Sequence, residues 1–271
     1  MTRRSFFAMF VALACLSVAL ATTAAEPQRL LLLGQGPDGH PAGTHEYLPG
    51  LEILARCLET TPDLELSLVK ADEPWSEGPE LLEDADGAVV FLSEGAKWLS
   101  ADSPRLEAFR ALAKRGGGLV VIHWGMGTKP PENIAPFVEL FGGCHGGPDR
   151  RYKVVDTKLK VAAPAHPIAN GIKDLDVHEE FYYQLKFPKA VDRLRPVLQA
   201  LIEGRTETVA WAYECAGGGR SFGFSGLHFH ENWRHEAYRR LVTQGVLWTL
   251  GREIPADGVR VDVETADVSG Q

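Results

Sequence analysis

The chain has 271 residues, 45% of them hydrophobic, and a formal net charge of −8. This length suits one elaborated α/β domain, and the apolar fraction is enough for a sizeable core. The positive charges are scattered along an acidic chain, which argues against a nucleic-acid partner because such a partner needs a basic stripe.

The N-terminal segment has the layout of a secretory signal. Arg3 and Arg4 precede an apolar run at 6–20, and a stretch of small residues leads up to Glu26. The run is too short for a comfortable membrane span, so we predict a cleaved signal peptide over residues 1–25 and no stable span in the mature protein. The twin arginines also resemble a twin-arginine export signal. We therefore expect an exported protein, periplasmic or secreted, with an uncleaved membrane anchor as the alternative.

Three cysteines remain beyond this segment, Cys57, Cys144 and Cys215. An odd, widely spaced set is not a disulfide framework, and the chain has no Cys-x-x-Cys pair for a zinc ribbon. We expect buried free thiols, with a single disulfide as the alternative.

The first half of the chain alternates strand and helix patterns. They predict a strand at 29–33, a helix at 46–59, strands at 64–69 and 88–92, a helix at 104–115 and a strand at 117–123. The last of these runs is continuously apolar and begins with glycines, which is typical of a strand buried on both faces of a parallel sheet. The alternation predicts a parallel sheet with right-handed crossovers.

The second half is less regular. It predicts a short helix at 134–141, strands at 152–155, 158–161, 194–202 and 207–213, a hairpin turn at 217–219, a strand at 221–224 and a closing helix at 238–250. We expect one domain over residues 26–255, followed by a loose polar tail over residues 256–271.

Several histidines lie at or near the ends of predicted strands, where an α/β sheet usually binds its ligands. His45, His123, His228 and His230 sit just after predicted strands or in the loops that follow them, and His145 lies in a glycine-rich loop. A single histidine is usually structural or on the surface. Ligands of open α/β sheets bind at the carboxyl ends of the strands, however, so several imidazoles at one sheet edge favour a functional role.

An acidic pair, Glu179 and Glu180, precedes three aromatic residues at 181–183. A carboxylate beside aromatic rings is a candidate general acid or base with a raised pKa, and the rings are candidate surfaces for stacking on a sugar. The alternative is a solvated acidic turn before an edge strand.

Imidazoles with one carboxylate are also a zinc-like ligand set, which makes His45, His123 and His228 candidate ligands of a divalent metal such as zinc or manganese. No local His-Glu-x-x-His spacing supports this. The chain lacks a Gly-x-Ser-x-Gly elbow, a Walker A loop and a Rossmann fingerprint, which disfavours a serine nucleophile and nucleotide cofactors.

The order of several short motifs resembles the trehalose-utilisation (ThuA-like) proteins, which have the class I glutamine-amidotransferase-like fold. The matching stretches are Gly43-Thr44-His45-Glu46-Tyr47, Gly117 to His123, His166-Pro167-Ile168 with Gly171, Glu179-Glu180-Phe181-Tyr182, and Gly226-Leu227-His228. Each stretch is weak alone, but their order and spacing across the whole domain are fairly specific.

The resemblance implies a flavodoxin-like three-layer α/β/α sandwich with a mostly parallel sheet. In true amidotransferases a cysteine sits at the sharp turn after the strand that here ends at His123. The chain has no cysteine between Cys57 and Cys144, so we expect no glutaminase activity. The segment that carries the amidotransferase histidine would map onto His230, whereas the ThuA-like pattern favours His228.

The resemblance also implies a carbohydrate-active enzyme of the hydrolase, lyase or isomerase type, acting on a small sugar or keto-sugar derivative. Its expected catalytic residues are His45, His123, Glu180 and His228, with or without a divalent metal. The expected substrate-binding residues are Trp124, His145, Glu179, Tyr183 and His230. The alternative is a non-catalytic sugar-binding or accessory domain, with stacking surfaces at Trp124, Tyr182, Tyr183 and Trp233.

Overall fold

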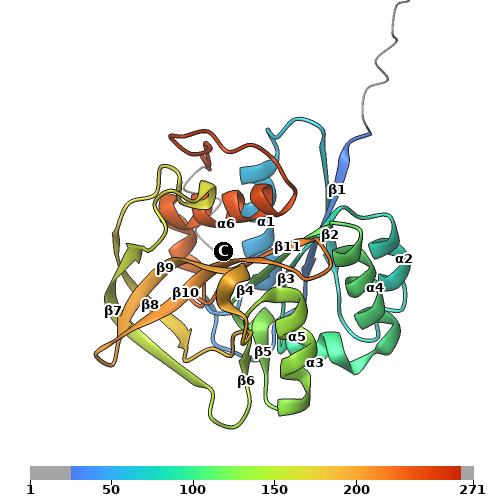
Figure 1. The fold of residues 1–271 in the computed structure, drawn as a ribbon, viewed down its shortest axis with the longest axis horizontal. Coiled ribbons are helices and arrows are strands. Elements are labelled where there is room, and N and C mark those ends of the chain that lie inside the picture. The colour runs from blue at the N-terminus through green and yellow to red at the C-terminus, as the bar shows by residue number, and fades with distance from the viewer. Residues whose placement is uncertain (1–25, 264–271) are drawn as a thin grey trace, which may run out of the picture.

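A nine-stranded sheet forms the centre of the protein, whose computed structural model describes residues 26–263. The strands lie in the order β2-β1-β3-β4-β11-β10-β9-β7-β8 (Figure 1). The predicted signal peptide, residues 1–25, falls outside the described residues.

The first five strands of this order are parallel. They are β2 (Leu64–Lys70), β1 (Gln28–Gly34), β3 (Gly87–Phe91), β4 (Gly118–Ile122) and β11 (Arg220–Phe224). Every residue of β3 and β4 is buried, as the continuous apolar runs predict for strands covered on both faces.

The other four strands pair antiparallel. They are β10 (Arg205–Glu214), β9 (Leu194–Ile202), β7 (Arg151–Val161) and β8 (Leu175–Tyr183). The expectation of a mostly parallel, flavodoxin-like sheet is therefore wrong for half of the strand pairings, and the sheet as a whole is mixed. A separate parallel pair joins β5 (Gly127–Thr128) to β6 (His145–Gly146).

Two predictions about the antiparallel half also need correction. The two short strands expected at 152–155 and 158–161 form one continuous strand, β7. The acidic pair does not lie in a turn before a strand but inside β8, which forms the edge of the sheet. Successive side chains of a strand point to opposite faces, so Glu179 and Glu180 have different surroundings.

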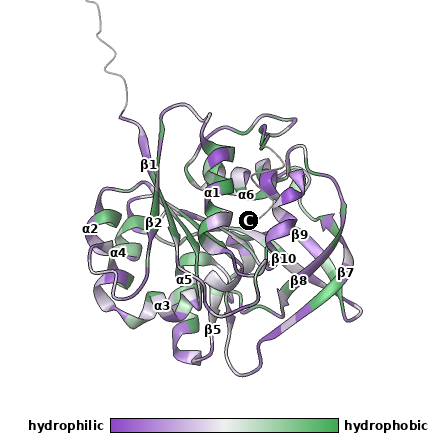
Figure 2. Cartoon of the chain, turned by 180° about the vertical axis from the view of Figure 1, so that it is seen from behind, coloured by the Kyte–Doolittle hydropathy of each residue, from purple (hydrophilic) through white to green (hydrophobic). Residues whose placement is uncertain are grey.

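Helices cover both faces of the sheet. One face carries α1 (Tyr47–Leu58) and α6 (Glu236–Thr249), and the other carries α2 (Gly78–Glu83), α3 (Gly95–Ala101), α4 (Ser103–Lys114) and α5 (Ile134–Phe141). Each group of helices packs with the strands into its own buried cluster, one containing Leu51 and Leu241, the other Phe109 and Phe137. Figure 2 shows the hydrophobic strands between helices of mixed hydropathy.

The predicted C-terminal tail is partly ordered against the domain. Arg239 donates a 2.9 Å hydrogen bond to the carbonyl of Val261, and the Val259 N–H donates to Gln244 at 2.9 Å. Val261 is buried. Residues 256–263 therefore pack along α6, whereas we expected a loose tail from residue 256.

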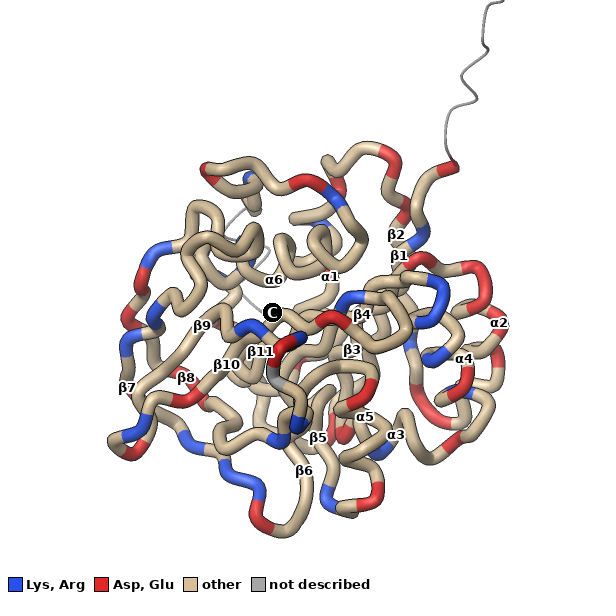
Figure 3. Tube along the Cα trace, in the orientation of Figure 1, with Lys and Arg blue, Asp and Glu red and all other residues tan. Residues whose placement is uncertain are grey.

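The structure also bears on membrane spans, on the cysteines and on the distribution of charge. Within residues 26–263, no helix has the length and apolar character needed to cross a bilayer. Cys57, Cys144 and Cys215 are buried free thiols, as predicted. Acidic and basic residues are interspersed along the described chain (Figure 3).

Candidate functional site

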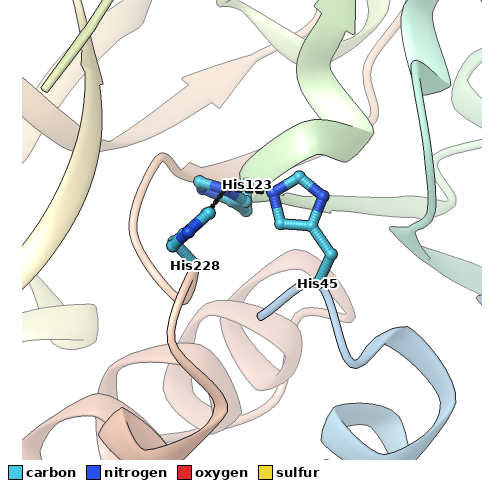
Figure 4. Close-up of side chains that lie close together, drawn as sticks. All are labelled: His45, His123 and His228. Carbon is cyan, nitrogen blue, oxygen red and sulfur yellow. Dashed lines mark hydrogen bonds between the residues drawn. The ribbon is translucent and has the colours of Figure 1, made fainter. Parts of the chain in front are cut away.

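Three histidines from distant parts of the chain meet at the carboxyl edge of the parallel strands. His45 lies in the loop after β1, His123 follows β4 directly, and His228 follows β11. Parallel strands end at the same edge, which is where open α/β sheets bind ligands. The two outer loops are tied together, because the His45 N–H donates to the His228 carbonyl at 3.1 Å. The three rings point toward one another (Figure 4).

Unusual backbone conformations aim these rings. The φ angles of His45, His123 and Leu227 are 55°, 46° and 71°, all in the left-handed region. Non-glycine residues adopt this region at a cost of roughly 1–3 kcal/mol, and they persist only where their surroundings hold them, often at functional sites. His123 thus occupies a sharp turn at the end of β4, as the resemblance to the amidotransferase-like fold implied.

The ring nitrogens are close enough to share one ion. His123 Nε2 lies 3.1 Å from His45 Nε2 and 3.2 Å from His228 Nδ1, and all three atoms lie within 4.8 Å of one another. Two ligand atoms of a tetrahedral site with bonds of about 2.0 Å are separated by about 3.3 Å. The two spacings to His123 Nε2 therefore match those expected within a metal-ligand set.

Partners outside the cluster fix which ring nitrogens face inward. His123 Nδ1 donates to the Ser225 carbonyl at 2.9 Å, and His45 Nδ1 donates to a carboxylate oxygen of Asp38 at 2.9 Å. Burial lowers the pKa of His45 and lowers that of His123 well below its usual range, so both rings are neutral. Each Nε2 atom then carries a lone pair. Two lone pairs 3.1 Å apart repel, and a cation bound between them would relieve this repulsion.

Asp38 is a site residue that the sequence did not reveal. Partial burial opposes its ionisation, but hydrogen bonds from His45, Tyr47 and His40 outweigh this and lower its pKa. The Tyr47 hydroxyl donates to Asp38 at 2.6 Å, and the His40 ring lies against the His45 ring with centroids 3.7 Å apart. A carboxylate behind a histidine is the usual second partner of a metal-binding imidazole, because it fixes the tautomer.

Strand β8 contributes a carboxylate and a phenol to the same site. Glu180 Oε1 lies 3.5 Å from His228 Nδ1 and 4.0 Å from His123 Nε2. The Tyr182 hydroxyl donates to His123 Nε2 at 3.0 Å, and its ring stacks on the His123 ring. Burial raises the pKa of Glu180 to about 7. The sequence pointed to Glu180, but it named Tyr182 only as a stacking surface for the binding alternative.

Glu179 has a different position from the one expected of a substrate-binding residue. Its side chain is fully buried and does not line the cavity. Its carboxylate accepts hydrogen bonds from the N–H groups of Leu227 and His228, at 2.8 and 3.2 Å, and from the Asn232 amide at 2.9 Å. Burial nevertheless raises the pKa of Glu179 to about 7, against these hydrogen bonds. Glu179 therefore holds the loop that carries His228.

The cluster opens into a cavity of about 530 Å³. Its lining residues are Asp38, His40, His45, Ser93, Glu94, Trp124, Lys129, His145, Arg150, Tyr152, Glu180, Tyr182 and His228. The predicted residues Trp124 and His145 thus face the cavity beside the three-histidine cluster. This size and this mixture of aromatic and polar groups are typical of small-molecule sites.

Two other predicted substrate-binding residues lie elsewhere. Tyr183 points to the opposite face of β8 from Tyr182, and its hydroxyl donates to Glu203 at 3.0 Å. His230 is buried outside the cavity lining, two residues beyond His228. A more open groove of about 730 Å³, between β7, β8 and residues 231–235, contains none of the predicted site residues.

Solved structures share this fold at low sequence identity. A putative ThuA-like protein of Bacteroides uniformis has a TM-score of 0.64 and 13% identity, over 87% of this chain and 97% of its own. One from Parabacteroides merdae has a TM-score of 0.63 and 16% identity, over 90% and 100%. A protein of Salmonella typhimurium described as cytoplasmic has a TM-score of 0.55 and 16% identity, over 82% and 98%. At these identities the likeness establishes the fold alone.

The sequence itself identifies the family. No curated protein matches the chain. Residues 39–249, which include all three histidines of the cluster and Glu180, match the ThuA family, described as trehalose utilisation. This match spans most of the chain and agrees with the solved structures of ThuA-like proteins. The chain belongs to the ThuA, trehalose-utilisation, family.

Proposed function

We propose that this ThuA-family protein is an exported carbohydrate-active enzyme that acts on a sugar or keto-sugar derivative at the three-histidine cluster. The observation that carries the proposal is the convergence of His45, His123 and His228 beside Glu180 at the base of a sugar-sized cavity. A buried structural histidine needs one partner for each ring nitrogen. In this cluster, by contrast, three groups lie 3.0–3.2 Å from the single atom His123 Nε2, namely His45 Nε2, His228 Nδ1 and the Tyr182 hydroxyl.

The residues of the cluster fit a divalent cation such as zinc or manganese. Neutral imidazole nitrogens are the ligands that these ions take, and His45 and His123 already direct their lone pairs inward. Asp38 and the Ser225 carbonyl would hold the two ligands in orientation. When bound, the ion would supply Lewis acidity toward a sugar oxygen.

Glu180 is the residue we propose to move a proton. Its carboxylate lies at the cluster and also lines the cavity, so it reaches both the histidines and a bound molecule. Trp124 and His145 line the cavity near it. A carboxylate next to a polarised sugar oxygen suits hydrolysis, elimination or isomerisation next to a carbonyl.

The activity is tested with purified protein and trehalose, other disaccharides and their keto derivatives, with products followed by mass spectrometry. Glu180→Gln keeps the shape of the side chain but cannot exchange a proton. We expect it to lower kcat by about 100- to 10,000-fold. Glu231→Gln, an exposed acid outside the cavity, serves as the matched control and should keep the wild-type rate. Turnover by Glu180→Gln at the wild-type rate would contradict the assigned role.

A non-catalytic sugar-binding domain is the second candidate, favoured by the aromatic rings of the cavity. Trp124 and His145 line the cavity and pack against Tyr182 at centroid distances of 5.7 and 3.9 Å, and their rings are candidate surfaces for a sugar face. Sugar affinity without turnover of any tested sugar would support this function instead.

The location is a separate part of the proposal. It rests on the twin arginines, the apolar run and the small residues of the N-terminal segment. Expression of the full chain followed by cell fractionation tests it. We expect an exported protein whose N-terminus lies near Glu26. Full-length protein confined to the cytoplasm would contradict this expectation.

A further inference from the structure

The cavity has a second end, beyond Tyr182 as seen from the three-histidine cluster. The Tyr182 ring stacks on His123 with centroids 4.3 Å apart and on His145 with centroids 3.9 Å apart. It thus separates the cluster from an outer end lined by His145, Arg150 and Tyr152. A ligand that occupies the whole cavity would contact both ends.

Arg150, at this outer end, has no counter-ion within the described part of the chain. Among residues 26–263 no carboxylate forms an ion pair with it, and its guanidinium makes one 3.2 Å hydrogen bond, to the Gly147 carbonyl. The neighbouring carboxylate, Asp149, is held instead by Lys186 at 2.6 Å. The other lining cation, Lys129, lies 3.9 Å from Glu94. Arg150 therefore lines the cavity with a charge that no described carboxylate compensates, and one hydrogen bond leaves most of its five N–H donors available.

His145 supplies a second polar group without a partner. Its ring is buried, with 2% of its surface exposed, and its Nδ1 atom has no hydrogen-bond partner among the described residues. Burial and the positive charge of Arg150 lower the pKa of His145 to about 3. A neutral ring beside an unpaired guanidinium suits a negatively charged or strongly polar ligand group, since buried polar groups are normally satisfied.

We propose that the substrate carries an anionic group, a carboxylate or a phosphate, that Arg150 binds at the outer end of the cavity. The guanidinium fork matches both groups through paired hydrogen bonds. The sugar ring would then lie between Arg150 and the three-histidine cluster. This inference rests on the proposed function, because it names the substrate class of the same cavity.

Isothermal titration calorimetry with glucose, glucuronate and glucose 6-phosphate tests the inference. Glucose is neutral, glucuronate carries a carboxylate and glucose 6-phosphate carries a phosphate. Comparing the two charged sugars shows which of these anionic groups the site binds. We expect at least one charged sugar to bind the wild-type protein at least about tenfold more tightly than glucose. The preference should weaken as salt is added.

Two single substitutions assign that preference to one side chain. Arg150→Met should bring the affinities of the charged sugars to within about threefold of glucose, whereas Arg151→Met, an exposed arginine outside the cavity, should keep the preference. Thermal melting confirms that both variants fold. Arg150→Lys, which keeps the charge but loses the fork, should fall between Arg150→Met and the wild type.

The outcomes separate this inference from the proposed function. Equal binding of all three sugars by the wild type, or a preference that survives in Arg150→Met, would overturn the anion site while leaving sugar turnover standing. An Arg150-dependent preference without turnover of any sugar would support the anion site and overturn the enzymatic proposal. No binding of any of the three sugars would count against both.

Discussion

Adjacent carboxylates in β8 have separate tasks because strand side chains alternate between faces. Glu180 and Tyr182 share the face that lines the cavity, whereas Glu179, Phe181 and Tyr183 point to the opposite side. Glu179 accepts four hydrogen bonds, including one from the Glu180 N–H at 2.9 Å. We interpret it as the residue that positions the His228 loop rather than one that touches substrate.

Substituting Glu179 by Gln tests this role. The amide keeps the volume of the side chain, but its NH₂ group faces backbone N–H donors, so a buried hydrogen bond is lost and a donor is left unsatisfied. We expect the free energy of unfolding in urea to fall by about 1–3 kcal/mol. Glu231→Gln, an exposed acid of the same region, should change it by less than about 0.5 kcal/mol. Equal stability of the two variants would show that Glu179 does not anchor the loop.

The sequence predicted the imidazoles and Glu180 because each lies at or near a recognisable strand. It did not predict Asp38 and His40, which lie in a loop rich in glycine and proline, where no regular spacing links them to His45. It chose Tyr183 over Tyr182 because β8 was not recognised as one strand. If the strand at 175–183 had been recognised, the alternation of its side chains would have placed Tyr182 on the same face as Glu180.

At the scale of elements, the turn that carries His123 is packed tightly against helix α3. The single 3₁₀ turn at His123–Met126 follows β4, and α3 begins beside it at Gly95. A Cβ atom on Gly95 would lie 2.1 Å from the Gly125 carbonyl oxygen. Only glycine allows this approach of helix and turn, so Gly95 helps to set the position of His123.

Substituting Gly95 by Ala should therefore disturb both stability and the site. The added methyl group meets backbone that cannot move without displacing the turn, and we expect a loss of at least about 2 kcal/mol in unfolding free energy. Gly36→Ala is the matched control, because its Cβ would meet only the Lys70 side chain, at 3.8 Å. Unfolding in urea measures both. A Gly95→Ala protein as stable as Gly36→Ala would contradict this packing argument.

The sequence predicted most accurately those helices and strands whose own residues form a clear hydrophobic pattern. The buried strands β1, β3 and β4 and the amphipathic helices α1, α4 and α6 were predicted within a few residues. Helices α2 and α3 were not predicted, since they have six and seven residues and no side-chain N-cap. Strand β8 was not predicted as one strand, and a turn at its acidic pair stood as the alternative, because the partners of Glu179 are N–H groups of residues 227 and 228, far along the chain.

At the scale of the whole molecule, the three-histidine cluster joins segments that are remote in sequence. His45, His123 and His228 follow β1, β4 and β11, three strands of the parallel half of the sheet. An ion held by all three rings would cross-link these segments in the folded state only. Binding that is specific to the native state raises stability by mass action.

Removing the ion should therefore lower the melting temperature. With free metal at about 100 times its dissociation constant, the stabilisation is about 2.7 kcal/mol, which corresponds to a shift of about 5–10 °C for a domain of this size. We expect dialysis against a chelator to lower Tm by this amount in the wild type and to leave His228→Ala unchanged. Restored zinc or manganese should reverse the shift. An unchanged Tm in the wild type would contradict a structural contribution of the ion.

The metal content of the purified protein shows whether His45, His123 and His228 bind an ion. His228 is the ligand to remove, because its own backbone is not among the left-handed residues that alanine would strain, and the exposed His178 provides the matched His→Ala control. Elemental analysis should find about one zinc or manganese per chain in the wild type and in His178→Ala, and much less in His228→Ala. A wild-type protein that holds neither metal, even after incubation with both, would show that the three-histidine cluster is not a metal site.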